Sequence, residues 1–568
     1  MERERDRKVK IPYQTKKQEK KQQQQQQHQQ KQNTAMKDSY TVSANDGGGQ
    51  GGSPPLPPPP SAISHRPSLT GIHNVGFTSD DSGFGSGEAT GGRQELGLQQ
   101  RVDVKPKRVM QMIGTFAAAL AHLGIGTIIG FSGVTLPQLT DQESPKFSLT
   151  DFQATLFSSV IHLGATLGCV VGGVPHAFIG HRWSLLVALP GSLVAWLVLF
   201  FSRVPWLLIL ARGVLGFTMG VTCFSASNYV KEFAHKDLKP SLLVALDALR
   251  QSGFLLVYGL GYKAHLSWRY VAIICGTLTT VVPFLILLFL PNAPRWLVLR
   301  GRMDEAERSL QFYRGRDYDC RSELLKIRNK LERRRDSVTM TDQLRNMRDP
   351  VLLRYVVLFA FLHFVSQFTG EVVISAYIVP LFELAHASSP YDDAIIVGAM
   401  RVLATLVYFL GVQRVGRKRL VISSFLICGF SLAVLAISFY DQSRDKIFSD
   451  YEVIPIITIS IFSFFSNIGI PVLNLVDVEL LPGTAKATGL AILYGTYYFG
   501  GFIATLTYPT MIASIGPSST FWVYCVFNII VVVIDYADLP ETRGKTSEEI
   551  ITREREDDVS KKGPLPSY

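Results

Sequence analysis

The sequence predicts an all-α transmembrane protein whose helices form two bundles of six. Apolar runs of about 20 residues recur along the 568-residue chain, and a helix of that length crosses about 30 Å of hydrocarbon. A charged stretch within 291–350 separates six such runs from six more. Short motifs also recur at equivalent places in the two sets, which is typical of transporters built from two related halves. We therefore expect twelve helices with pseudo-two-fold symmetry.

Residues 1–107 are poor in apolar side chains. A Lys/Gln tract runs from Lys16 to Gln32 and a proline run from Pro54 to Pro60, among Gly- and Ser-rich sequence. Such a composition buries too little apolar surface to offset the entropy of the chain, so we predict a disordered Gln/Gly/Pro-rich cytoplasmic tail. The proline run is also a candidate site for a proline-motif-binding partner, because polyproline II segments dock in aromatic grooves.

The apolar runs give the expected helices in order. Those of an N-terminal bundle over 108–290 lie at 110–136, 153–178, 183–201, 204–229, 240–262 and 269–290. A cytoplasmic helical linker is expected over 291–350, with helical stretches at 303–314 and 323–335. Those of a C-terminal bundle over 351–538 lie at 352–382, 392–413, 419–438, 453–481, 485–513 and 519–537. Residues 539–568 are expected to form a cytoplasmic tail.

The distribution of charge sets the expected orientation. The link after the fourth helix carries Lys231, Lys236 and Lys239, and the link after the eighth carries Arg417 among other cations. Links of the opposite parity are mixed or acidic, so the positive-inside rule puts both termini in the cytoplasm. We expect a multi-pass protein embedded in the lipid bilayer, with the plasma membrane as its location.

Composition and motifs exclude several other classes. The net charge of +11 comes from cations in the tail and beside the apolar runs, where cytoplasmic retention explains them, so we expect no nucleic-acid partner. The six cysteines show neither a pairing pattern nor metal spacing. No nucleophile, base and acid occur at a recognisable spacing. We expect no catalytic residue, no metal and no cofactor, and hence no enzyme.

Glycines recur at intervals of three or four residues on two expected helices. The two sets are Gly164, Gly168 and Gly172 on the second helix, and Gly213, Gly216 and Gly220 on the fourth. In lipid, small residues at this spacing allow helix backbones to approach closely. The pattern therefore predicts tight helix packing.

Three motifs recur near the predicted cytoplasmic ends of the helices. Gly180-His181-Arg182 corresponds to Gly416-Arg417-Lys418, Glu232 corresponds to Glu479, and the segment ending at Arg295 corresponds to the one ending at Arg543. Since guanidinium forks pair well with carboxylates, these groups are expected to pair across the two halves and latch the cytoplasmic side. The alternative is that they only anchor loops at the headgroups. The candidate latch residues are Arg182, Glu232, Arg295, Arg417, Glu479 and Arg543.

Two of these segments resemble a known family. Pro540-Glu541-Thr542-Arg543-Gly544-Lys545-Thr546-Ser547-Glu548-Glu549-Ile550 closely resembles the signature after the last helix of sugar porters in the major facilitator superfamily. The segment from Pro291 to Leu297 resembles its mid-chain counterpart, with Asn292 where the family has a glutamate. Residues 283–315 look most like the insect facilitated trehalose transporters. The resemblance covers about 109–552. It implies a twelve-helix major facilitator fold that moves a hexose or trehalose-like sugar by alternating access.

The segment from Ser366 to Tyr377 places polar groups within an apolar run, at a depth where such groups usually face a bundle interior. A sugar site needs neutral donors and acceptors. The resemblance puts Gln251 and Gln367 where sugar porters supply amides, whereas other amides and a tryptophan of the family are replaced. The candidate solute-binding residues are Gln251, Ser366, Gln367, Thr369, Arg401, Asn474 and Tyr497.

Arg401 leaves two interpretations open, because an intramembrane arginine must be paired or face water. Either it forms a structural ion pair with Glu371, or it binds an organic anion, because its planar guanidinium suits bidentate recognition of such a group. A further alternative is a non-transporting solute sensor or scaffold that signals through its tail. The first expected helix contains no Asp or Glu, which favours facilitated diffusion, although His122 and His162 could carry a proton.

Overall fold

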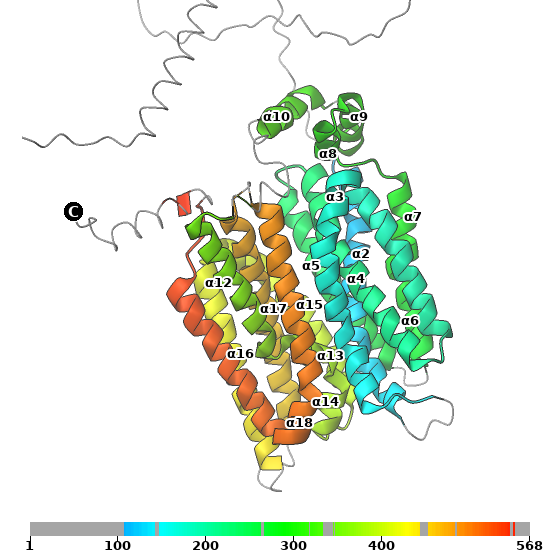
Figure 1. Cartoon of the computed structure of the whole chain (residues 1–568), viewed down its shortest axis with the longest axis vertical. Coiled ribbons are helices and arrows are strands. Elements are labelled where there is room, and N and C mark those ends of the chain that lie inside the picture. The colour runs from blue at the N-terminus through cyan, green and yellow to red at the C-terminus, as the bar shows by residue number, and fades with distance from the viewer. Residues whose placement is uncertain are drawn as a thin grey trace, which may run out of the picture. The chain divides into compact units, whose positions relative to one another are not determined.

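The computed structural model describes residues 107–141, 147–262, 266–316, 318–332, 345, 347–442, 453–482, 485–545, 549–550 and 552. Every regular element in this part of the chain is a helix (Figure 1). The predicted tail before Lys107, its proline run and the end of the C-terminal tail lie outside the described residues.

The N-terminal half contains α2 (Val109–Thr140), α3 (Asp151–Phe201), α4 (Pro205–Phe233), α5 (Lys239–Tyr262), α6 (Trp268–Gly276), a π-helical turn (Thr277–Val281) and α7 (Val282–Phe289). The long α3 passes through Gly180, whose φ of 82° and ψ of 163° are not helical. Any other L-residue would be strained there, and its Cβ would lie 3.0 Å from the ring of Trp296. Gly180 therefore divides α3 into the second and third expected helices.

The linker forms three short helices at one end of the molecule, called the linker end below: α8 (Pro294–Leu299), α9 (Met303–Arg314) and α10 (Cys320–Glu332). α9 has the bounds that its sequence predicts, and it is fixed to the N-terminal half. The ring of Tyr313 stacks on Phe233 with centroids 4.4 Å apart, and its hydroxyl lies 2.7 Å from that of Tyr229. Arg314 donates to the carbonyl oxygen of Phe233 at 2.7 Å and pairs with Glu323 of α10.

The C-terminal half contains α12 (Pro350–Ser366), a 3-10 turn (Gln367–Thr369), α13 (Glu371–Ala376), α14 (Ile378–Leu384), α15 (Pro390–Arg414), α16 (Arg417–Gln442), α17 (Val453–Leu480) and α18 (Lys486–Asp538). The expectation of one helix over 352–382 was wrong. Gly370 adopts a left-handed φ of 104° and ends the first piece, and Tyr377 separates α13 from α14. Glycine permits this turn because it lacks a Cβ. Hydropathy detects the length of such a segment but not its dihedral angles.

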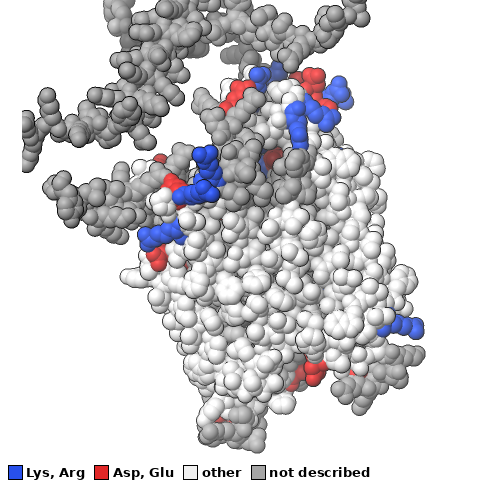
Figure 2. All heavy atoms as spheres, in the orientation of Figure 1, with Lys and Arg blue, Asp and Glu red and all other residues white. Residues whose placement is uncertain are grey.

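Eleven described helices are long and apolar enough to cross a membrane. The last, Thr488–Asp538, contains Gly516, whose φ of 80° and ψ of 166° break the helix directly before Pro517. In Figure 1 the two parts of α18 meet at the end opposite the linker. Divided at Gly516, the described helices provide the twelve passes that the sequence predicts. Figure 2 shows charged side chains at the two ends of the visible face and an uncharged belt between them, as a bilayer requires.

The largest contacts between the two halves form where α5 packs against α15, α3 against α18, and α2 against both α13 and α14. Within the N-terminal half, glycines bring α3 and α4 into backbone contact. A Cβ on Gly216 would lie 2.0 Å from the carbonyl oxygen of Ile161, and one on Gly164 would lie 2.1 Å from that of Gly213. The close packing predicted from the glycine spacing is therefore confirmed at these positions.

Candidate functional site

The break at Gly370 forms the floor of a buried polar region. Two hydroxyls before it turn back to their own helix: Ser366 donates to the carbonyl oxygen of His363 at 2.8 Å, and Thr369 donates to that of Ser366 at 2.6 Å. The amide of Asn528 donates to the carbonyl oxygen of Thr369 at 3.0 Å, so α18 holds the non-helical turn in place. Ser366 and Thr369 thus satisfy this backbone rather than pointing freely into a cavity.

Arg401 lies on α15 and is buried. Its Nη2 is 2.7 Å from Oε1 of Glu371, its Nη1 donates to the hydroxyl of Ser375 at 2.8 Å, and its Nε donates to Oε1 of Gln251 at 3.1 Å. The guanidinium also lies 4.0 Å above the ring centroid of Phe254. Its charge is therefore balanced by one carboxylate and its donors are spread over both halves.

Gln251 is the link between the halves at this depth. Besides accepting from Arg401, its amide donates to Oδ1 of Asn467 on α17 at 2.5 Å. The hydroxyl of Tyr258, two helical turns further along α5, donates to the carbonyl oxygen of Ser375 at 3.2 Å. Since α5 belongs to the N-terminal half and the partners belong to the other, these bonds hold the centre of the molecule closed.

The remaining candidate solute residues lie on the C-terminal side of this centre. Gln367 is 2 % exposed. Asn474 has a buried Oδ1 that makes no hydrogen bond to the described part of the chain. The structure thus joins Gln251 to Arg401. Whether these side chains bind solute stays a prediction.

Sequence reasoning missed Asn467 and Ser375, which complete the central network. Asn467 lies seven residues before Asn474 on α17, hence two helical turns away on the same face, and this spacing was a usable signal. Ser375 lies four residues, or about one turn, after Glu371 on α13. The partners Gln251 of Asn467 and Arg401 of Ser375 come from other helices and could not be assigned from the sequence.

A second buried arginine was also missed. Arg212 of α4 donates to the carbonyl oxygens of Ile128 at 2.7 Å and Phe157 at 3.2 Å, and to the hydroxyl of Ser132 at 2.8 Å. These three acceptors are neutral and come from α2 and α3. Arg212 therefore ties three helices of the N-terminal half together, and its presence in the middle of an apolar run was the available signal.

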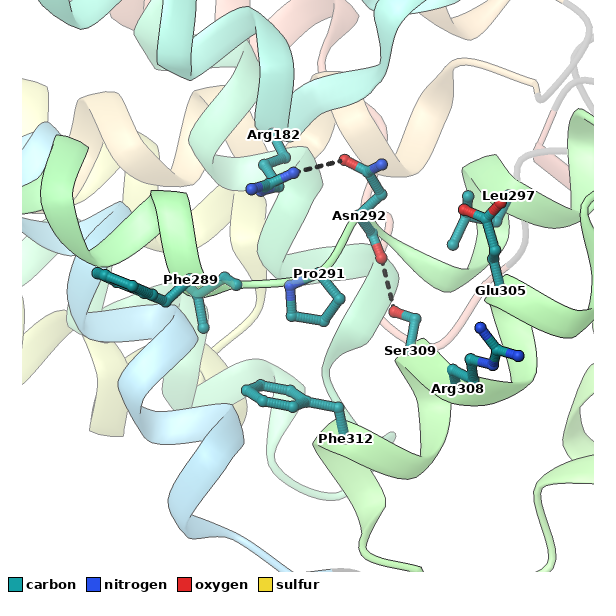
Figure 3. Close-up of a pocket in the computed structure, with 10 residues that line it drawn as sticks. Arg182, Phe289, Pro291, Asn292, Leu297, Glu305, Arg308, Ser309 and Phe312 are labelled. Carbon is teal, nitrogen blue, oxygen red and sulfur yellow. Dashed lines mark hydrogen bonds between the residues drawn. The ribbon is translucent and has the colours of Figure 1, made fainter.

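At the linker end, the N-terminal latch candidates pair differently from the expectation. Arg182 donates to the carbonyl oxygens of Leu287 and Leu288, both at 3.0 Å, and to Oδ1 of Asn292 at 3.3 Å (Figure 3). It borders a cavity of about 360 Å³ between α7 and α9. Asn292 stands where the family has a glutamate, so Arg182 caps the end of α7 instead of joining a carboxylate.

The carboxylate of Glu232 is approached within its own half. Nε2 of His181 lies 3.7 Å from it, and Arg295 of α8 attracts it electrostatically. In the described part of the chain, the ion pairs of the latch candidates therefore lie inside each half, and pairing across the halves stays a prediction. Both partners of each pair sit on neighbouring helices of one bundle, which places them closer than residues of the other bundle.

The C-terminal latch candidates form a compact cluster. Nη2 of Arg417 lies 3.0 Å from Oε1 of Glu479, and the hydroxyl of Thr542 donates to the other oxygen of Glu479 at 2.5 Å. Glu541 accepts from the backbone N–H of Arg417 at 3.0 Å, and Arg543 donates to the carbonyl oxygen of Arg414 at 2.8 Å. Glu479 thereby fixes the segment after α18 to α16 and α17.

Replacing Glu479 by glutamine is expected to loosen the segment after α18. The substitution removes charge-assisted bonds worth about 1.5–3 kcal/mol, so local opening should increase about 10-fold or more. The measurement is the rate of tryptic cleavage after Arg543 in detergent-purified protein, with Glu332→Gln, an exposed carboxylate on α10, as the control. An unchanged rate in the Glu479 variant would mean that other contacts hold the segment.

Comparisons with known proteins give the family. Residues 108–553 match the family model described as sugar (and other) transporter. The chain is 28 % identical over 450 residues to the facilitated trehalose transporter Tret1 of Apis mellifera ligustica, covering 78 % of this chain and 88 % of the relative. It is 27 % identical over 486 residues to the human solute carrier family 2, facilitated glucose transporter member 6, covering 81 % and 93 %.

The solved structures agree on the fold. The major facilitator superfamily proton:xylose symporter XylE of E. coli, bound to 6-bromo-6-deoxy-D-glucose, superposes with a TM-score of 0.64 at 20 % identity, covering 78 % of this chain and 99 % of that one. The described helices thus have the major facilitator fold. The match to the transporter family and the apolar helices show a multi-pass membrane protein rather than an enzyme. Because the family model spans most of the sequence, the chain belongs to the sugar (and other) transporter family.

Proposed function

We propose that this protein moves a neutral sugar of the hexose or trehalose type across a membrane, down its gradient, by alternating access. The observation that carries the proposal is the amide pair Gln251–Asn467, which joins the two halves at the buried centre. Each amide both donates and accepts hydrogen bonds, as a sugar hydroxyl does, so a sugar can replace the partner that each amide loses when the halves separate. Curated relatives named as trehalose and glucose transporters support the substrate class.

The arrangement of Arg401 favours a sugar over an organic anion. Its charge is already balanced by Glu371 at 2.7 Å, so an anion would have to displace a partly buried carboxylate. A neutral solute needs no such exchange. The sensor alternative has no contact in the described residues that favours it, and measurable flux would decide against it.

Alternating access assigns a role to the contacts between the halves. The bonds of Gln251 to Arg401 and Asn467 close the centre, and they must break when either side opens. The contacts at the linker end act within each half and keep each bundle rigid. In this scheme both termini and the linker are cytoplasmic, and the plasma membrane is the proposed location.

The test is uptake into reconstituted vesicles of labelled trehalose, glucose and small carboxylates, with and without a pH gradient. We expect sugar uptake that follows the concentration gradient of the sugar and needs no pH gradient. Gln251→Leu should raise KM about 10-fold, equivalent to about 1.4 kcal/mol, because leucine has a similar size but forms no hydrogen bond. Gln442→Leu removes an amide near the end of α16 and serves as the control.

Two outcomes would contradict the proposal. Carboxylate uptake without sugar uptake would make Arg401 a recognition residue. Folded protein without flux of any tested solute would favour a sensor.

A further inference from the structure

A buried acid–base pair lies inside the C-terminal half, outside the central network. Nε2 of His363 on α12 is 2.6 Å from Oδ2 of Asp477 on α17, and both side chains are 0 % exposed. An ionised carboxylate at membrane depth is costly unless it is paired, so Asp477 needs the contact with His363 in the folded bundle.

Each member of the pair keeps one atom unused. Nδ1 of His363 and Oδ1 of Asp477 are buried and make no hydrogen bond to the described residues. In the neutral imidazole, Nε2 carries the hydrogen that is donated to Asp477, which leaves Nδ1 as the basic nitrogen. A proton added to Nδ1 converts a neutral donor into an imidazolium, and the existing contact becomes an ion pair with a stronger, charge-assisted bond.

The pair joins α12 and α17, two of the helices on or beside which candidate solute residues lie. His363 lies four residues, or about one turn, before Gln367, and Asp477 lies three residues after Asn474. The imidazole also meets the ring of Tyr497 edge-on, with centroids 5.8 Å apart. A change in the strength of the pair is therefore transmitted to three of the candidate solute residues.

Other titratable and charged groups surround the pair without replacing it. On α18, Tyr494 and Tyr497 face the imidazole, and Lys486 donates to the carbonyl oxygen of Val478. From α16, Arg417 is engaged by Glu479. On α5, Arg250 is paired with Asp247. Arg250 and Arg417 are thus paired with other carboxylates, and Asp477 is paired with His363.

We propose that His363 and Asp477 are a proton-responsive positioning pair for the solute site: protonation of His363 strengthens the tie between α12 and α17 and thereby raises the affinity for solute. The proposal rests on the proposed transport function. It requires no cotransport of the proton, which binds to and leaves Nδ1 while the solute moves down its own gradient.

The test compares wild type, His363→Gln and Asp477→Asn as full-length protein in vesicles, with equal pH on both sides. The wild-type KM for the transported sugar should fall about 10-fold as the pH is lowered from 8 to 5.5, whereas Vmax changes little. Glutamine keeps an N–H donor for Asp477 but takes up no proton, so His363→Gln should retain transport with a KM independent of pH. His235→Gln removes a histidine that follows α4 and lies 3.4 Å from Asp237, and it should keep the wild-type profile.

A second readout separates this proposal from the proposed function. The thermal unfolding temperature of detergent-purified wild type should depend on pH between 5.5 and 8, and His363→Gln should lose part of that dependence even if the tested solutes are wrong. Absence of sugar flux with the stability difference intact would refute the proposed function alone. A wild-type KM that does not vary with pH, or a His363→Gln profile identical to wild type, would overturn the positioning pair. If His363→Gln does not fold, Asp477→Asn decides by the same two readouts.

Discussion

Replacing Arg401 by methionine is expected to destabilise the protein by about 3 kcal/mol, because it leaves the partly buried carboxylate of Glu371 without its counter-charge. Glu371 has Arg401 as its ion-pair partner, and Ser375 and Gln251 also lose a donor. The measurement is unfolding of detergent-purified protein by heat or denaturant. Arg203→Met, which removes an exposed arginine, is the control and should change stability by no more than about 0.5 kcal/mol.

A double-mutant cycle tests the cause. Glu371→Leu alone should also be strongly destabilising, because it leaves the guanidinium of Arg401 buried without a counter-charge. The double variant combines Arg401→Met with Glu371→Leu and so removes both charges together. It should recover most of the loss, since apolar replacements of buried ion pairs are often neutral. If the double variant is as unstable as the sum of the single variants, the pair contributes through packing rather than charge.

Gly216→Ala is expected to cost about 3 kcal/mol or more, because overpacking a tight contact forces backbone shifts. The new Cβ would lie 2.0 Å from the carbonyl oxygen of Ile161, so α3 and α4 must separate along their length. Gly213→Ala on the same helix is the matched control. Its Cβ would meet nothing closer than Cγ2 of Val160 at 3.6 Å, and its stability should stay near that of wild type or rise slightly.

Thermal unfolding of the two glycine variants, side by side, is the measurement. Equal losses in both would mean that helix propensity or lipid contacts, rather than the backbone contact with Ile161, determine the role of these glycines. A loss confined to Gly216→Ala would support the contact. Because both sites lie on α4, differences in expression or detergent binding are largely shared.

The sequence predicts the helical passes well, because length and apolarity are local properties that a membrane imposes. α9 has its expected bounds, and the family signature after α18 identifies the fold. The break at Gly370 was less predictable. A glycine in an apolar run is compatible with a continuous helix, and only the surrounding helices, such as Asn528 on α18, make the left-handed turn stable.

Partners across helices were the least predictable part of the candidate site. The sequence named Glu371 as a partner for Arg401 because opposite charges at membrane depth must find each other. It offered no comparable reason to join Gln251 to Asn467 or His363 to Asp477, since amides and histidines accept many partners. The partners of Arg182 were hard to predict for a similar reason: its guanidinium donates to carbonyl groups at the end of α7, and the pattern of charges in the sequence carries no information about backbone acceptors.

The docking of α9 on the N-terminal half has a practical consequence for imaging. Particles of a protein enclosed by a detergent micelle are hard to align, because little protein projects from the belt. Here the stack of Tyr313 on Phe233 and the bond from Ser309 to the carbonyl oxygen of Asn292 at 2.6 Å hold α9 rigidly to the transmembrane helices. An antibody fragment raised against the exposed surface of α9 and α10 would therefore inherit the orientation of the N-terminal half and serve as a fiducial mark for cryo-electron microscopy.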